Sequence, residues 1–283
     1  MNRTLTLGYS PCPNDTFIFH ALAEGRINVE PYRFDISLAD VEVLNQRARE
    51  GSLHVSKVSI HAMLHLLDEY WLLRSGGALG RGCGPLVVAR ESTTMEDLAH
   101  KSIAIPGRMT TANLLLRLHG AHRGPSVEMS FDLIMQAVAN GEVDAGVIIH
   151  EGRFTYPAMG LELVLDLGDW WERRMGVPLP LGGIVIRRDL GPEVALLVEE
   201  KIRESLAYAR SRPEEAWPYI RAHAQEMEPE VIRRHIDMFV NDFSRDVGEE
   251  GEKAIRTILE AASKLENLLL PNKPVFLDRT PIH

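Results

Sequence analysis

Short apolar, β-branched runs alternate with stretches of helical spacing along most of the chain. In the first part, apolar runs at 4–9, 32–37 and 52–59 are each followed by a helical pattern, at 14–25, 38–51 and 60–70. Strands that alternate with helices in this way form a largely parallel sheet with helices on both faces. The alternation therefore predicts an α/β fold.

The same alternation starts again after residue 90 and gives way to nearly continuous helical pattern from 193 to 270. We predict a two-lobed α/β protein with mixed, mostly parallel sheets and a helical C-terminal region. The large lobe comprises residues 1–90 and 183–283, and a smaller lobe, 91–182, is inserted into it. Ligands of such folds bind at the carboxyl ends of the strands, so we expect the site in the cleft between the lobes.

The composition and charge of the chain limit the classes of partner that we expect it to bind. The net charge of −9 comes with no basic stripe, so nucleic-acid binding is not expected. No apolar run reaches membrane-spanning length, and the first residues do not resemble a signal peptide. The two cysteines, Cys12 and Cys83, lack the spacing of a metal-binding pair. We predict a cytoplasmic protein that binds neither nucleic acid nor membrane.

Four polar segments follow apolar strands: "YSPCPNDTF", "SKVSIHA", "IPGRMTTANLLL" and "IIHEGRFTY". The carboxyl ends of parallel strands lie at one edge of a sheet, so these segments can converge on one site. The ordinary alternative is that loops after strands are polar because they lie at the surface.

Two of these segments carry groups suited to an anion. Thr110 or Thr111 caps a predicted helix whose first N–H groups favour a carboxylate or phosphate, although from this stretch alone a plain cap with water in the site is the commoner use of such residues. Lys57 and the neighbouring serines can hold an anionic group; alternatively, Ser59 caps a helix and Lys57 is solvated.

His150 ends an apolar strand and can carry a proton near neutral pH. Glu151 or a backbone carbonyl could fix its tautomer. From position alone, a catalytic base and a structural histidine are equally well supported.

His61 and His65 are spaced by four residues, as two metal ligands on one helical face would be. Their apolar neighbours fit a packing helix, and no third ligand is evident from the sequence. We therefore predict no metal site.

Taken together, six segments resemble the 1,4-dihydroxy-6-naphthoate synthases of the futalosine route to menaquinone. They run in order from Gly8 to about Ile184: "GYSPCPNDTFIFHAL", "SKVSIHA", "GCGPLVV", "IAIPGRMTTANLLL", "GEVDAGVIIHEGRFTY" and "LPLGGI". Such a dispersed set is more specific than a lone motif. It disfavours the sibling chorismate dehydratases, which share the fold but not this set of segments.

The resemblance implies a two-lobed fold similar to periplasmic binding proteins (type II), used for catalysis without a cofactor. The family is a lyase family that converts cyclic dehypoxanthinylfutalosine, which carries a carboxylate, to 1,4-dihydroxy-6-naphthoate. Its catalytic histidine falls on His150, expected to act as proton acceptor. Its substrate-binding stretches fall on Lys57, Val58, Ser59, Thr110, Thr111 and Ala112. To these we add Asn14, Asn113, Arg153 and Tyr156 as candidates for orienting the substrate.

Three other functions stay open at this point. The chain could be a non-catalytic ligand-binding protein of the same fold, a chorismate dehydratase, or a metal-dependent hydrolase that uses His61 and His65. The long C-terminal helices could also pack against a second copy, which makes a homodimer possible.

Overall fold

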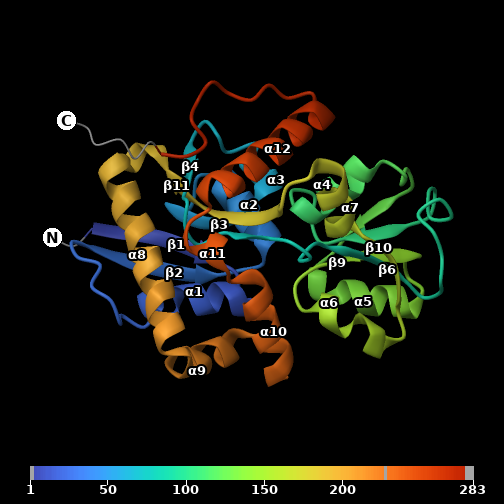
Figure 1. The fold of residues 1–283 in the computed structure, drawn as a ribbon, viewed down its shortest axis with the longest axis horizontal. Coiled ribbons are helices and arrows are strands. Elements are labelled where there is room, and N and C mark those ends of the chain that lie inside the picture. The colour runs from blue at the N-terminus through green and yellow to red at the C-terminus, as the bar shows by residue number, and fades with distance from the viewer. Residues whose placement is uncertain (1–2, 226–227, 278–283) are drawn as a thin grey trace.

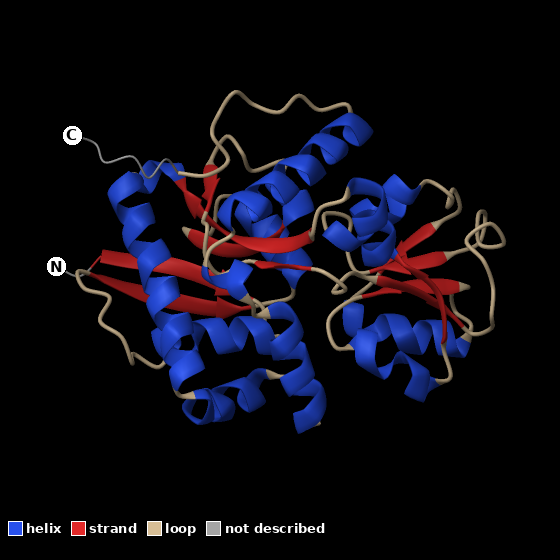
Figure 2. Ribbon diagram, in the orientation of Figure 1, coloured by secondary structure: helices blue, strands red, loops and turns tan. Residues whose placement is uncertain are grey.

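The computed structural model describes residues 3–225 and 228–277 and contains two β-sheets, each covered by helices on both faces (Figures 1 and 2). We call the part around the six-stranded sheet the large lobe and the part around the five-stranded sheet the small lobe. The chain passes into the small lobe after β5 and returns in β11.

The sheet of the large lobe has the strand order β2-β1-β3-β11-β4, and β5 also pairs with β11. Strand β1 is parallel to β2 and β3, whereas β11 is antiparallel to β3, β4 and β5. All five residues of β3 are buried, as expected for a strand inside the sheet. The strands are β1 (Arg3–Tyr9), β2 (Tyr32–Leu38), β3 (Val55–Ser59), β4 (Tyr70–Leu72), β5 (Ala78–Gly80) and β11 (Leu179–Arg187).

Two groups of helices cover this sheet (Figure 1). One face carries α1 (Pro13–Ala23), α8 (Pro192–Ser211), α9 (Pro213–His223) and α10 (Pro229–Phe239). The other carries α2 (Val41–Arg49), α3 (Ile60–Met63) and α12 (Gly248–Glu266), and the short α11 (Asp242–Arg245) precedes α12. The helical C-terminal region therefore wraps both sides of the large lobe.

The small lobe has the strand order β10-β6-β9-β7-β8, in which β7 is parallel to β8 and β9. Its strands are β6 (Leu86–Ala89), β7 (Ile103–Ile105), β8 (Ser126–Glu128), β9 (Ala145–Ile148) and β10 (Glu162–Asp166). Helices α4 (Thr111–His119) and α7 (Leu167–Met175) lie on one face, and α5 (Phe131–Asn140) and α6 (Gly152–Thr155) on the other (Figure 1). A short 3₁₀ helix follows α6 at Tyr156–Met159, and another, Arg188–Leu190, follows β11 in the large lobe.

Three details differ from the sequence prediction: the two crossings between the lobes and the segment 60–70. The predicted lobe boundary at residue 90 falls after β6, but β6 pairs with β9 and β10, so the chain crosses before Leu86. It returns at Leu179, where β11 begins, and not at 183. The segment 60–70, predicted as one helix, is helical only over Ile60–Met63. It then tightens into i→i+3 turns, because Tyr70 pairs with Arg187 of β11.

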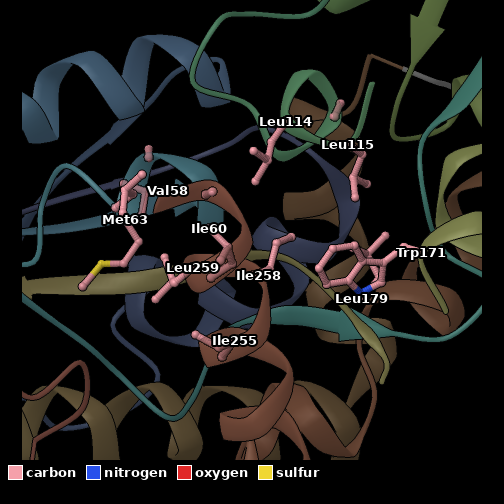
Figure 3. Close-up of a cluster of buried hydrophobic side chains, with 14 of the residues drawn as sticks. Val58, Ile60, Met63, Leu114, Leu115, Trp171, Leu179, Ile255, Ile258 and Leu259 are labelled. Carbon is pink, nitrogen blue, oxygen red and sulfur yellow. The ribbon is translucent and has the colours of Figure 1, made fainter. Parts of the chain in front are cut away.

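One hydrophobic cluster continues from the large lobe into the small lobe (Figure 3). Val58 and Met63 from β3 and α3, with Ile258 from α12, belong to the same buried cluster as Leu115 of α4 and Trp171 of α7. Buried apolar contacts of this kind hold the lobes together on the side of α3, α4 and α12. Among the residues that the structure describes, no helix has the length and apolar character needed to cross a membrane.

Candidate active site

A pocket lies where the two lobes meet, and all four of the polar segments that follow strands contribute to its wall. Its empty space, mouth included, is about 690 Å³. Ser10, Asn14 and Asp15 follow β1, Lys57 and Ser59 belong to β3, and the start of α4 follows β7. The remaining wall includes Ile149, His150, Arg153, Cys83, Gly84, Pro85, Leu181, Gly182 and Phe239. The expectation that these segments converge is therefore met.

His150 lies just beyond β9 with a left-handed backbone, φ 54°. Its ring lies between two aromatic neighbours: Phe131 meets it edge-on at 4.9 Å, and His235 stacks on it at 5.9 Å with an interplanar angle of 18°. Nε2 is buried and has no hydrogen-bond partner among the described residues. Burial, with a smaller contribution from Lys57, lowers the pKa of His150 to about 4, so the ring is neutral at pH 7.

His235 comes from α10 of the large lobe, so its contact with His150 spans the two lobes. The side chain is fully buried, and its Nε2 lies 2.9 Å from Oδ1 of Asn14. Burial, together with His150 and Lys57, lowers the pKa of His235 well below the usual range. Sequence analysis missed this residue, because it lies in the middle of a helix and far along the chain from every polar segment that follows a strand.

Asp15 forms the electrostatic centre of the pocket and was also missed, although it lies within the quoted segment "YSPCPNDTF". Its Oδ1 accepts hydrogen bonds from Nζ of Lys57 at 2.7 Å and from Nδ2 of Asn14 at 2.8 Å. Its Oδ2 accepts one from the Ser10 hydroxyl at 2.7 Å. Both charged side chains are buried. The ammonium of Lys57 is thus already paired and is not the isolated anion anchor that the sequence suggested.

The start of α4 presents backbone donors more than hydroxyl donors. Thr110 caps the helix: its Oγ1 accepts from the N–H of Asn113 and donates to the carbonyl of Gly107 at 2.7 Å. The Thr111 hydroxyl donates to the carbonyl of Leu181 at 2.7 Å. Both hydroxyl protons are therefore in use. Helix geometry leaves the N–H groups of Thr111 and Ala112 without an intrahelical acceptor.

The other predicted side chains divide between the pocket and its surroundings. Arg153 lines the pocket, where it binds Asp166 and the carbonyl of Gly84, both at 2.6 Å. Val58 instead faces the hydrophobic cluster, because successive residues of a strand point to opposite faces. Asn113 lines a second pocket, and Tyr156 packs on the core of the small lobe. Those three side chains are not part of the wall.

Ser59 is better placed than these. Its hydroxyl accepts a hydrogen bond from Asn45 at 3.1 Å, and no acceptor for its own proton lies among the described residues. Cys12 is buried, and burial raises the pKa of its thiol, so it is unsuited to act as a nucleophile.

Solved structures of low sequence identity place the fold in a class. The periplasmic aliphatic sulphonate binding protein SsuA from Escherichia coli superposes with a TM-score of 0.65 at 15% identity, covering 100% of this chain and 96% of its own. That likeness shows the fold alone: a two-lobed, periplasmic-binding-protein-like architecture with a cleft between the lobes.

Closer relatives define the family. The family model for menaquinone biosynthesis matches residues 5–264, and the chain belongs to this family. A "1,4-dihydroxy-6-naphtoate synthase" from Thermus thermophilus is 52% identical, over 97% of this chain and 100% of its own length. A protein of the same name from Streptomyces coelicolor is 46% identical, over 92% and 93%. A crystal structure from Archaeoglobus fulgidus is 38% identical with a TM-score of 0.87, covering 94% of this chain and 98% of its own.

Proposed function

We propose that the protein is a 1,4-dihydroxy-6-naphthoate synthase, a lyase that converts cyclic dehypoxanthinylfutalosine to 1,4-dihydroxy-6-naphthoate and releases the sugar-derived fragment. Two relatives at 52% and 46% identity carry this name and match nearly the whole chain. The observation that carries the proposal at the level of the site is the unpartnered, buried Nε2 of a neutral His150 in the pocket wall.

In this proposal His150 is the proton acceptor. A neutral imidazole whose Nε2 has no partner in the protein is free to take a proton from a bound substrate. Removal of the proton starts an elimination that aromatises the ring, so much of the driving force comes from the substrate. The rings of Phe131 and His235 fix the plane of the imidazole, and this contribution is one of positioning.

The anchors for the substrate follow from the available donors. A carboxylate fits the N–H groups of Thr111 and Ala112, where the helix dipole of α4 also favours negative charge. Ser59 offers its hydroxyl proton. Lys57 adds a third N–H beyond those used by Asp15 and the carbonyl of Gly76. Ala78, Pro85, Leu181 and Phe239 supply an apolar wall for a fused ring system.

The runner-up is a non-catalytic ligand-binding protein with the fold that this chain shares with SsuA. Turnover separates the two functions. We would incubate the purified protein with cyclic dehypoxanthinylfutalosine and follow the release of naphthoate by chromatography. Turnover of chorismate in place of this substrate would instead identify the sibling dehydratase.

The variant that tests the base is His150→Asn, because asparagine tolerates the left-handed backbone at this position. We expect kcat to fall by roughly 10²–10⁴-fold, the usual contribution of a general base. Substrate binding, measured by calorimetry, should persist. The control is His100→Asn at an exposed histidine, which should leave kcat unchanged. Equal rates for wild type and His150→Asn would assign the proton to another group.

We add three expectations to this proposal, on the compartment, on closure of the lobes and on assembly. We propose a cytoplasmic enzyme, on the strength of its biosynthetic relatives. The two lobes act as domains that close over the substrate and exclude water.

A homodimer is supported by the exposed run Leu268, Leu269 and Leu270 after α12. Analytical ultracentrifugation of the wild type beside a Leu269→Ser variant tests that assembly.

A further inference from the structure

A second cluster of chemically competent side chains lies outside the pocket of His150. His61 and His65, at and just after α3, meet Glu266 at the C-terminal end of α12. His61 Nε2 lies 2.9 Å from Oε1 of Glu266, and His65 Nε2 lies 3.3 Å from Oε2. One donor atom from each of the three residues falls within 4.8 Å of the others.

The two nitrogen–oxygen distances, 2.9 Å to Oε1 and 3.3 Å to Oε2 of Glu266, are close to the distances between ligands of one metal ion, and small side-chain rotations would bring all three donor atoms to a common centre. A tetrahedral Zn²⁺ with nitrogen and oxygen ligands at about 2.0–2.2 Å places its donor atoms roughly 3.3 Å apart. Two imidazoles and a carboxylate are also a donor set that first-row transition cations prefer and that Mg²⁺ does not. The spacing of the two histidines raised this possibility from the sequence. Glu266 is the third ligand that the sequence could not show.

The surroundings of His61 are those of a metal-binding histidine. Its ring is buried, and its Nδ1 lies 3.3 Å from the backbone carbonyl of Thr110. Without a cation, Nε2 of His61 is hydrogen-bonded to Oε1 of Glu266 at 2.9 Å. When a cation takes the place of that proton, the ring proton lies on Nδ1 and is donated to the carbonyl of Thr110. Histidine ligands are oriented in this way by a carbonyl or carboxylate behind the ring. Solvent reaches the cluster, because the three side chains line a surface pocket with Asn113 and Arg117.

Arg117 is the competing group. Its guanidinium lies 2.6 Å from Oε1 of Glu266, so the carboxylate has a cationic partner when no metal is bound. The side chain of Arg117 is 41% exposed and can move into solvent. Metal binding therefore exchanges a partly exposed ion pair, which contributes little stability, for coordination.

We propose that His61, His65 and Glu266 form a binding site for a divalent first-row transition cation such as Zn²⁺, with water completing the coordination. The site is separate from the catalytic pocket. Residues 110–112 line the catalytic pocket, whereas Met109 and Asn113, on either side of them, line the second. The proposal departs from the sequence prediction of no metal site.

The cation ties the chain together at the junction of the lobes. It links α3 to the end of α12, which lie 205 residues apart, and His61 also contacts Thr110 and Thr111 at the start of α4. A ligand that binds only the folded chain stabilises it by mass action. The expected role is structural: a clamp behind the helix start that faces the substrate.

The test measures Zn²⁺ binding to the metal-free full-length protein by equilibrium dialysis, with Co²⁺ absorption as a report of tetrahedral geometry. Wild type should bind one Zn²⁺ per chain and gain thermal stability, with no effect from Mg²⁺ at the same concentration. His65→Ala and Glu266→Gln should each weaken binding at least tenfold. His65 is only partly buried, so its replacement should leave the fold intact.

Two further variants sharpen the result. His100→Ala, at an exposed histidine outside the cluster, should bind Zn²⁺ as the wild type does. Arg117→Met removes the competitor and should bind Zn²⁺ more tightly. The proposed site is overturned if Zn²⁺ binds with the same affinity to wild type, His65→Ala and Glu266→Gln. It is also overturned if bound Zn²⁺ leaves all melting temperatures unchanged.

Discussion

At the scale of single residues, the pocket works through burial. His150 and His235 lie ring against ring, and each is held neutral because burial penalises the charged imidazolium. Two neutral rings can stack at 5.9 Å without repelling each other, whereas two imidazolium ions could not. The same burial that makes the pair compatible keeps His150 ready to accept a proton.

This lowered pKa sets the pH dependence of the reaction. A histidine with an ordinary pKa loses its basic form below about pH 6.5. The pKa of His150 is lowered to about 4, so the basic form persists into more acidic solution. We expect kcat/KM to stay level from pH 7.5 down to about pH 5.5 and to fall only nearer pH 4. Steady-state kinetics across this range provide the check. An acid limb centred near pH 6.5 would contradict the assignment of a buried base.

The ion pair between Asp15 and Lys57 is also buried, so removal of one partner should be costly. Asp15→Asn leaves the ammonium of Lys57 buried without its counter-ion, which typically costs about 3–5 kcal/mol. We expect a loss of this size in the free energy of unfolding in urea. The double variant Asp15→Asn/Lys57→Met removes both charges and should recover part of the loss. A single variant as stable as the wild type would show that the ammonium finds another partner.

At the scale of elements, the part of the site at the start of α4 depends on the N-cap of that helix, Thr110. Thr110 satisfies one of the first N–H groups of the helix and leaves the next ones open to the pocket. Loss of the cap costs about 1 kcal/mol. Thr110→Ala should therefore lower stability by this amount and raise KM for a carboxylate substrate. Thr110→Ser keeps the hydroxyl and should restore both values, as measured by urea unfolding and initial rates.

The sequence predicted the elements of the fold well where their signal is local. The strands at β1, β3, β7 and β9 and their polar ends follow from short patterns, so the four segments of the pocket wall were found. Helix α4 and its threonine cap follow from a local signal in the same way. The antiparallel insertion of β11 does not, because pairing partners far apart in the sequence leave no local signature.

Residues that enter a site from a distant element are invisible for the same reason. His235 reaches His150 from α10, and Glu266 reaches His61 from the end of α12. Both lie on amphipathic helices, where a polar residue reads as solvent-facing. The prediction for Val58 failed for a different reason. The resemblance to the family placed Val58 at the site, but side chains alternate along β3, and that of Val58 points into the core.

At the scale of the whole molecule, the shared hydrophobic cluster makes the two lobes one cooperative unit. Leu115 of α4 and Ile258 of α12 are both fully buried in it, although they belong to different lobes. We expect one calorimetric unfolding transition with equal calorimetric and van't Hoff enthalpies. Leu115→Ala, at a cost of about 2–5 kcal/mol, should move the whole transition to lower temperature. Ile134→Ala, in the separate small-lobe cluster, is the matched control for a local core defect.

Two resolved transitions, of which Leu115→Ala lowered only one, would show instead that the lobes unfold independently. One transition would show that the lobes unfold as one unit, as expected from the buried apolar contacts that they share on the side of α3, α4 and α12.

Strand β11 occupies an inner position of the large sheet, between β3 and β4, yet it is made only after the entire small lobe. During translation, the edges of β3 and β4 that pair with β11 therefore stay unpaired until residues 179–187 have left the ribosome. Unpaired edges of apolar strands are templates for aggregation. The large lobe therefore cannot complete its sheet while the inserted lobe is being synthesised. Synthesis of β11 is the step that allows the native sheet of the large lobe to form.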